Sequence, residues 1–139
     1  MLRPAVAGRV GVDALEIVVD AIEDSVQASP REMRALYALM FEALKPIPVL
    51  RERMLALHRG FATDLARHVR HGIEAGVVRP DIDPESTARL FLATLRGSAY
   101  LWLLDPERFD LAMALEDLRL HVNQTLRVVP ESAEASSLR

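Results

Sequence analysis

Residues 71–104 decide the fold, and they read H-G-I-E-A-G-V-V-R-P-D-I-D-P followed by E-S-T-A-R-L-F-L-A-T-L-R-G-S-A-Y-L-W-L-L. Gly76 is placed to end one helix, since glycine readily adopts the left-handed conformation found at helix C-termini. Asp83 and Pro84 are placed to begin the next, because aspartate caps free backbone N–H groups and proline fits the first helical position. The helix predicted from Pro84 is apolar on almost every side, so more than one of its faces must be covered.

Apolar residues recur at three- and four-residue steps along the rest of the chain, which predicts further helices. With the helix above, the expected ranges are about 13–27, 30–45, 49–75, 84–104 and 108–129. Ser29-Pro30 and Asp105-Pro106 repeat the cap-and-proline signal, while Pro46 and Pro48 end a helix. The sequence predicts an all-α, antiparallel bundle of about five helices at 12–129, with a lead-in at 1–11 and a disordered tail at 130–139.

Two features predict where helices come close to one another. Gly60 lies inside the 49–75 helix at a cost of about 1 kcal/mol relative to alanine, which suggests close approach by another helix. The last helix shows a coiled-coil-like seam. The seam consists of Leu111, Leu115, Leu118, Val122, Thr125 and Val129.

Composition excludes several classes of protein. Half of the 139 residues are hydrophobic but only 5% are aromatic, so the core is aliphatic. The net charge is −3 without a basic cluster, which argues against a free-standing nucleic-acid binder. The absence of cysteine excludes disulfides and thiolate metal sites. Arg89 and Arg96 interrupt the most apolar helix, which argues against a membrane span. We expect a cytoplasmic protein.

Signatures of catalysis or metal binding are weak. His68 and His71 lie three residues apart on a helix, but no third ligand accompanies them by spacing, so ordinary helix-end histidines are the favoured interpretation. The sequence has no phosphate-binding glycine loop, nucleophile elbow or paired-carboxylate pattern. We expect no enzyme activity, no metal and no cofactor.

Two segments resemble a known family. The link G-I-E-A-G-V-V-R-P-D-I-D-P at 72–84 and the segment L-R-G-S-A-Y-L-W-L-L-D-P at 95–106 are similar to the C-terminal regulatory domain of TetR-family transcriptional regulators. The resemblance covers roughly residues 12–129. It implies a small, often hydrophobic effector inside the bundle, and a homodimer in which the last two helices of each subunit form a four-helix bundle.

The N-terminal helix-turn-helix of that family has no counterpart before Asp13. The chain is therefore expected to contact DNA only through a unit that this sequence lacks. We expect a fragment of a longer regulator, with a natural stand-alone module as the alternative.

Methionine and aromatic residues gather in the 30–45, 49–75 and 84–104 helices, which suits an adaptable apolar cavity. Each could also be ordinary core. The expected lining is Tyr37, Met40, Phe61, Leu65, Phe91 and Leu95, with Tyr37 supplying the polar contact. Arg96 needs a partner in this apolar stretch, either an acidic effector or, as we favour, an acid such as Asp117 across a subunit interface.

The last two predicted helices carry more apolar surface than a five-helix monomer can cover, which predicts a dimer interface. Its expected residues are Leu90, Gly97, Leu101, Leu104, Leu111, Leu115, Leu118 and Val122. The predicted function is an effector-binding and dimerisation domain that senses a small apolar or aromatic molecule. The alternative is a stand-alone helical dimerisation or protein-interaction module with no small-molecule ligand.

Overall fold

The computed structural model describes residues 11–129, and these residues form five α-helices and no strand. The helices are α2 (Gly11–Ala28), α3 (Pro30–Glu42), α4 (Pro48–Glu74), α5 (Pro84–Leu104) and α6 (Leu111–Leu126). The predicted all-α fold with about five helices is confirmed. Most of the expected lead-in at 1–11 and all of the expected tail at 130–139 lie outside the described residues. None of the described helices is both long enough and apolar enough to cross a membrane.

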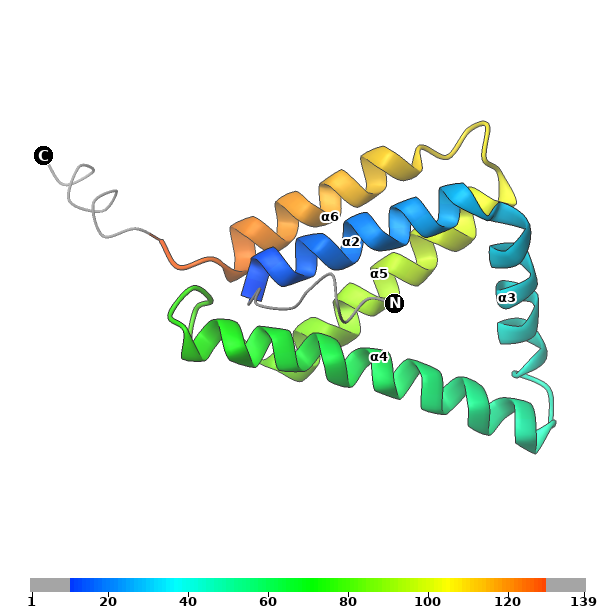
Figure 1. Ribbon diagram of the computed structural model, residues 1–139, viewed down its shortest axis with the longest axis horizontal. Helices are drawn as coiled ribbons and strands as arrows, with labels where there is room; N and C mark the ends of the chain where they lie inside the picture. The colour runs from blue at the N-terminus through cyan, green and yellow to red at the C-terminus, as the bar shows by residue number, and fades with distance from the viewer. Residues whose placement is uncertain (1–10, 130–139) are drawn as a thin grey trace, which may run out of the picture.

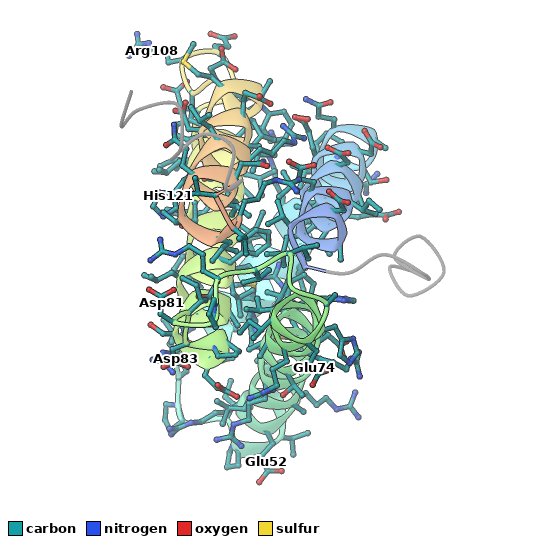
Figure 2. The ribbon with its side chains drawn as sticks, turned by 90° about the vertical axis from the view of Figure 1, so that its left-hand side faces the viewer. Glu52, Glu74, Asp81, Asp83, Arg108 and His121 are labelled. Atoms are coloured by element: carbon teal, nitrogen blue, oxygen red, sulfur yellow. The ribbon has the colours of Figure 1, made fainter. Side chains whose placement is uncertain are left out.

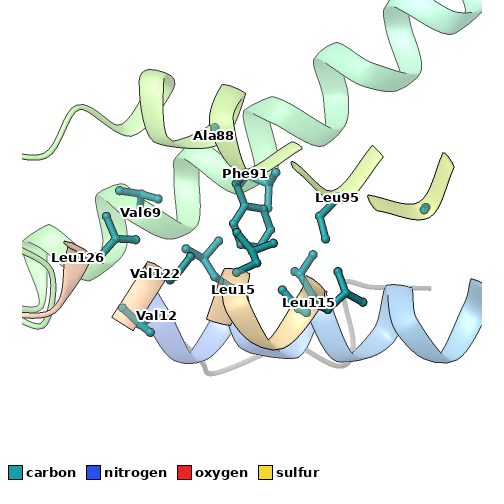
Figure 3. Packing of buried hydrophobic residues seen from close by; sticks show 14 of the residues in the cluster. Val12, Leu15, Val69, Ala88, Phe91, Leu95, Leu115, Val122 and Leu126 are labelled. Atoms are coloured by element: carbon teal, nitrogen blue, oxygen red, sulfur yellow. The ribbon is translucent and has the colours of Figure 1, made fainter. Parts of the chain in front are cut away.

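Four of the helices form two layers (Figure 2), with α2 and α4 in one layer and α5 and α6 in the other. Each of these four contacts two of the others, and α3 crosses one end of the group, between α2 and α4 (Figure 1). Side chains from all four long helices meet in the centre (Figure 3). Leu15, Val69, Phe91, Leu95 and Leu115 are among the buried residues there. This core joins helices that are far apart in the sequence.

The link before α5 has the local structure that the sequence predicts. Gly76 has a φ of +76°, a conformation that favours glycine, and it follows the end of α4. The Asp83 side chain accepts a hydrogen bond from the Glu85 N–H over 3.1 Å and so caps α5.

The last helix is shorter at both ends than predicted. It begins at Leu111 because Asp110, rather than Asp105, is its N-cap and accepts from the Met113 N–H over 2.9 Å. It ends at Leu126 instead of residue 129, because the chain becomes extended at Arg127 and pairs with the link after α4. There the Arg79 N–H donates to the Leu126 carbonyl over 2.8 Å. These backbone bonds tie the end of α6 to the link between α4 and α5.

The glycine that makes the close helix contact is Gly72 and not Gly60. A Cβ added at Gly60 would meet nothing within 4 Å, so the expectation of a close approach there is wrong within the chain. A Cβ at Gly72 would lie 2.4 Å from the Val78 side chain and 2.6 Å from the Gly11 Cα. The start of α2 therefore crosses the end of α4 at the backbone of Gly72.

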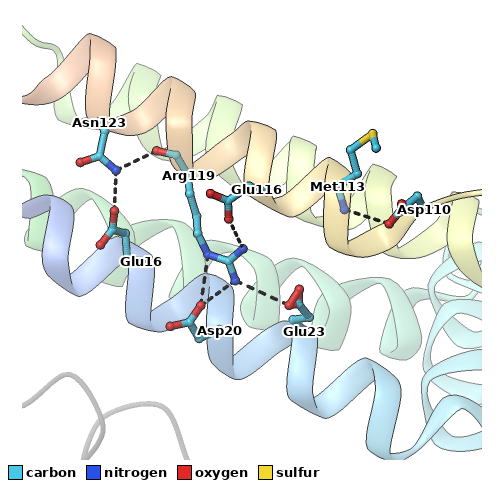
Figure 4. Close-up of polar contacts among 8 residues, drawn as sticks. All are labelled: Glu16, Asp20, Glu23, Asp110, Met113, Glu116, Arg119 and Asn123. Carbon is cyan, nitrogen blue, oxygen red and sulfur yellow. Dashed lines mark hydrogen bonds and ion pairs between the residues drawn. The ribbon is translucent and has the colours of Figure 1, made fainter.

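The predicted seam of α6 faces the interior of this chain. Leu111, Leu115, Leu118 and Val122 are 1–6% exposed and belong to the core cluster. The reason is that α2 lies alongside α6 and holds it with polar contacts (Figure 4). Arg119 contacts Asp20 over 2.6 Å and Glu23 over 3.6 Å. These four side chains, which the sequence predicts in a dimer interface, thus pack within the core of the single chain.

Candidate functional site

A cavity of about 100 Å³ lies where α3 crosses the end of the bundle. Four helices contribute its lining, including α2, which the sequence analysis did not assign to it. The lining residues are Ile22, Ser25, Met33, Tyr37, Phe61, Leu92, Leu95, Arg96 and Ala99. Leu92, Arg96 and Ala99 share the helical stripe of Leu95, so the spacing of α5 could have indicated them. The cavity combines apolar walls with one charged side chain.

The six residues predicted to line an effector cavity separate into four places. Tyr37, Phe61 and Leu95 line the cavity together. Met40 lies instead in an open groove of about 510 Å³ between α3 and the start of α4. Phe91 lines a groove of about 350 Å³ between α5 and α6, and Leu65 is 2% exposed within the core. Sequence spacing could assign these residues to apolar helix faces but could not tell which neighbour each face meets.

Arg96 lies between two aromatic rings at this cavity. Its guanidinium carbon is 5.9 Å from the centroid of the Tyr37 ring and 5.9 Å from that of Phe61. Such cation–π contacts contribute about 0.5–2 kcal/mol each. The Arg96 Nε is buried and has no hydrogen-bond partner among the described residues. Arg96 therefore lines the cavity, whereas its place in the sequence favours a pairing with Asp117 across a subunit interface.

Tyr37 joins α3 to α5 beside Arg96. Its hydroxyl donates a hydrogen bond to the Arg96 main-chain carbonyl over 3.1 Å. Burial raises the pKa of Tyr37, and this effect outweighs the opposing influence of the Arg96 guanidinium. The tyrosine is therefore neutral at physiological pH, and its hydroxyl proton is already engaged in the hydrogen bond to the Arg96 carbonyl. The Arg96 Nε–H, by contrast, has no hydrogen-bond partner among the described residues.

The outward face of α5 matches the second apolar face that its sequence predicts. Leu90, Gly97, Leu101 and Leu104 are all exposed, and Leu90 and Leu104 are 67% exposed. A Cβ at Gly97 would meet nothing within 4 Å, so the backbone there is open to an approaching surface. Beside this face runs the 350 Å³ groove between α5 and α6. These four members of the predicted interface remain available to a second copy.

The histidines form no metal site in the described part of the chain. No group of three or more His, Cys, Asp or Glu side chains there is arranged to hold an ion. His68 is partly buried, and burial together with the nearby Arg67 charge lowers its pKa. Its Nδ1 is buried without a hydrogen-bond partner among the described residues.

Comparisons with known proteins agree with this architecture. A crystal structure of a TetR transcriptional regulator from Chloroflexus aurantiacus J-10-fl superimposes with a TM-score of 0.78 at 23% sequence identity. The match covers 92% of this chain and 66% of that regulator, so the chain spans about two thirds of the regulator's length. No curated protein matches the sequence. The pattern of the BetI-type transcriptional repressor C-terminal domain matches residues 12–127. The chain belongs to this family of regulatory, non-enzymatic TetR C-terminal domains.

Proposed function

We propose that this domain binds a small apolar or aromatic effector in the cavity where α3 crosses α2, α4 and α5. The observation that carries the proposal is the cavity itself, which Tyr37, Phe61 and Leu95 line. Binding pockets are usually concave, mostly apolar and equipped with a few polar groups that orient the ligand. Arg96 supplies such a group here. Membership of a family of regulatory domains supports a sensing role.

We further propose that two copies pair through the outward face of α5 and the adjoining groove. The exposed residues Leu90, Gly97, Leu101 and Leu104 recur at helical spacing, and contiguous exposed apolar surface of this kind favours an interface. His121 and Thr125 of α6 border the same groove. A two-fold pairing of α5 and α6 with their copies would form a four-helix bundle.

The two sites share α5, which suggests how they are coupled. Arg96 lines the cavity, whereas its neighbour Gly97 lies on the outward face. A ligand that displaces α5 by a small amount would therefore change the angle between paired subunits. In a regulator with two helix-turn-helix units, recognition helices must be about 34–36 Å apart to engage DNA. A small rotation of the scaffold would change that spacing and release the operator.

A thermal-shift screen of small apolar and aromatic compounds tests the effector site. A ligand at a hundred times its dissociation constant stabilises the folded state by about 2.7 kcal/mol, which corresponds to several degrees in Tm. Ser25→Leu should remove the shift, because Ser25 is exposed and borders the cavity. Gln27→Leu, an exposed change on the same helix away from the cavity, should retain it. Equal shifts in both variants would place the binding site elsewhere.

A charge on the outward face of α5 tests the dimer. Leu101 and Leu57 are both 44% exposed, so they form a matched pair on α5 and α4. Leu101→Glu should shift the mass measured by light scattering toward the monomer, while Leu57→Glu should leave it unchanged. A wild-type monomer at micromolar concentration would refute the pairing. A dimer that no compound stabilises would favour the alternative, a dimerisation module without a small-molecule ligand.

A further inference from the structure

We propose that the effector carries a carboxylate, which binds the Arg96 guanidinium while a compact hydrocarbon body fills the rest of the cavity. This inference rests on the proposed effector site and specifies the chemical class of the ligand.

The half-buried arginines differ in whether a carboxylate pairs with them. In the described range 11–129, three arginines are half-buried as whole residues, namely Arg79, Arg96 and Arg119. Arg79 contacts the Asp81 carboxylate over 2.6 Å, and Arg119 contacts the Asp20 carboxylate at the same distance. No carboxylate of the described residues lies within ion-pair distance of Arg96. A buried donor without a partner destabilises the protein, so a ligand that satisfies it gains affinity.

Two aromatic rings flank the Arg96 guanidinium. The faces of Tyr37 and Phe61 already contact the Arg96 cation. A ligand ammonium could not take these faces without displacing that cation, and it would be repelled by the guanidinium charge. A carboxylate instead accepts short, charge-assisted hydrogen bonds from a guanidinium. The arrangement therefore favours an anion and disfavours a cation.

The size and lining of the cavity limit the rest of the ligand. About 100 Å³ is somewhat less than the roughly 150 Å³ of an engineered apolar cavity that holds benzene. Apart from Arg96, Tyr37 and Ser25, the lining is hydrocarbon or thioether. A branched short-chain acid has the appropriate volume, with its apolar part against Met33, Leu92 and Leu95, and a benzene-sized body is the upper limit.

Two isosteric series on the wild-type chain test the proposal without any substitution. One series compares 3-methylbutanoate, 3-methylbutanamide and 3-methylbutylamine, and the other compares benzoate, benzamide and benzylamine. Calorimetric titration should show that an acid binds at least about tenfold more tightly than its amide, as expected for a charge-assisted hydrogen bond, and that the amine does not bind.

Variants then locate the carboxylate contact. Arg96→Met should bring acid and amide to equal affinity, whereas Arg89→Met, an exposed change on the same helix, should preserve the preference. If Arg96→Met fails to fold, Arg96→Lys serves instead, because it keeps the charge but loses the guanidinium geometry and should reduce the preference.

The possible failures are distinguishable. Suppose that acids and amides bind the wild type equally well and that both fail to bind Ser25→Leu. That result would support the effector site but overturn the inference that the effector carries a carboxylate. If amines or neutral compounds are the strongest ligands in the wider screen, the carboxylate inference is likewise overturned. If neither series nor the wider screen yields a ligand, the effector site and the carboxylate inference both fail.

Discussion

The Tyr37 hydroxyl on α3 donates a hydrogen bond to the main-chain carbonyl oxygen of Arg96 on α5, over 3.1 Å. The two residues are 59 positions apart in the sequence, so this bond joins elements that only the tertiary fold brings together. The Tyr37 ring also lies against the Arg96 guanidinium and stacks on Tyr100 at 6.5 Å between centroids. The position of α3 over the cavity is therefore coupled to the position of α5.

Removing this hydroxyl should lower stability without altering the fold. Tyr37→Phe deletes one buried hydrogen bond, and the expected loss is about 1 kcal/mol in the free energy of unfolding. For a domain of this size, that corresponds to a decrease of a few degrees in Tm. Tyr100→Phe is the control, because Tyr100 is more exposed and its hydroxyl makes no hydrogen bond within the described residues. Equal Tm values for the two variants would contradict a structural role for the Tyr37 bond.

Two glycines of α4 should respond to alanine with opposite signs. At Gly72 the added methyl group would meet the Val78 side chain at 2.4 Å and the Gly11 backbone at 2.6 Å. Such overpacking destabilises by about 1–3 kcal/mol. At Gly60 nothing lies within 4 Å, so alanine should stabilise the helix by up to about 1 kcal/mol.

Urea denaturation of the two variants measures both effects. Each serves as the control for the other, since the substitution and the helix are the same. A Gly72→Ala protein as stable as the wild type would contradict the packing described at Gly72. A Gly60→Ala protein less stable than the wild type would contradict the open space described at Gly60.

This pair also illustrates how far the sequence could predict the fold. Helix starts, ends and apolar faces depend on local spacing and caps, and the expected bounds of α4 and α5 agree with the structure to within a residue. The end of α3 differs, because this helix stops at Glu42 rather than near residue 45. Whether Gly60 or Gly72 meets another backbone depends on the position along α4 at which α2 crosses it. Local sequence does not determine that position. The same holds for α6, whose apolar seam suits a partner subunit and an internal core equally well.

The candidate site was predicted in part for the same reason. Tyr37, Phe61 and Leu95 were identified because methionine and aromatic residues gather on three helices. Arg96 was recognised as a cation that needs a partner, but its direction from α5 depends on which face turns toward α3. The contribution of Ile22 from α2 was missed because helix 11–28 carries no aromatic residue.

His68 should make the fold sensitive to mildly acidic pH. Burial lowers its pKa, so the folded state disfavours the protonated form that the unfolded chain adopts below about pH 6.5. The stabilising contribution is present above the unfolded pKa and is lost as the pH falls through the lower, folded pKa. Urea titrations at about pH 7.5 and about pH 5 should show a larger loss of stability for the wild type than for His68→Gln.

The exposed His121 provides the control for this experiment. His121→Gln should retain the full dependence of the wild type on pH. If both variants show the same dependence as the wild type, the acid sensitivity arises from other groups.

The last prediction concerns Arg119, which joins α6 to α2. Its side chain is 18% exposed and contacts Asp20, Glu23 and Glu116, and Glu23 is itself 17% exposed. Arg119→Met should retain the hydrocarbon packing but leave the Glu23 carboxylate without its cation. The substitution also removes the hydrogen bonds that the guanidinium donates to Asp20 and Glu116. Hydrogen bonds to charged groups contribute about 1.5–3 kcal/mol, so a loss of about 2 kcal/mol in the free energy of unfolding is expected.

An exposed ion pair gives the comparison for Arg119. Arg67 contacts Asp64 over 2.6 Å, but the two side chains are 47% and 38% exposed. Arg67→Met should therefore change stability by no more than about 0.5 kcal/mol, since water and salt screen exposed pairs. A double-mutant cycle of Arg119→Met with Asp20→Asn should show a positive coupling energy in urea denaturation. If the two arginine variants were equally stable and the cycle showed no coupling, the Arg119 contacts would contribute nothing to holding α2 against α6.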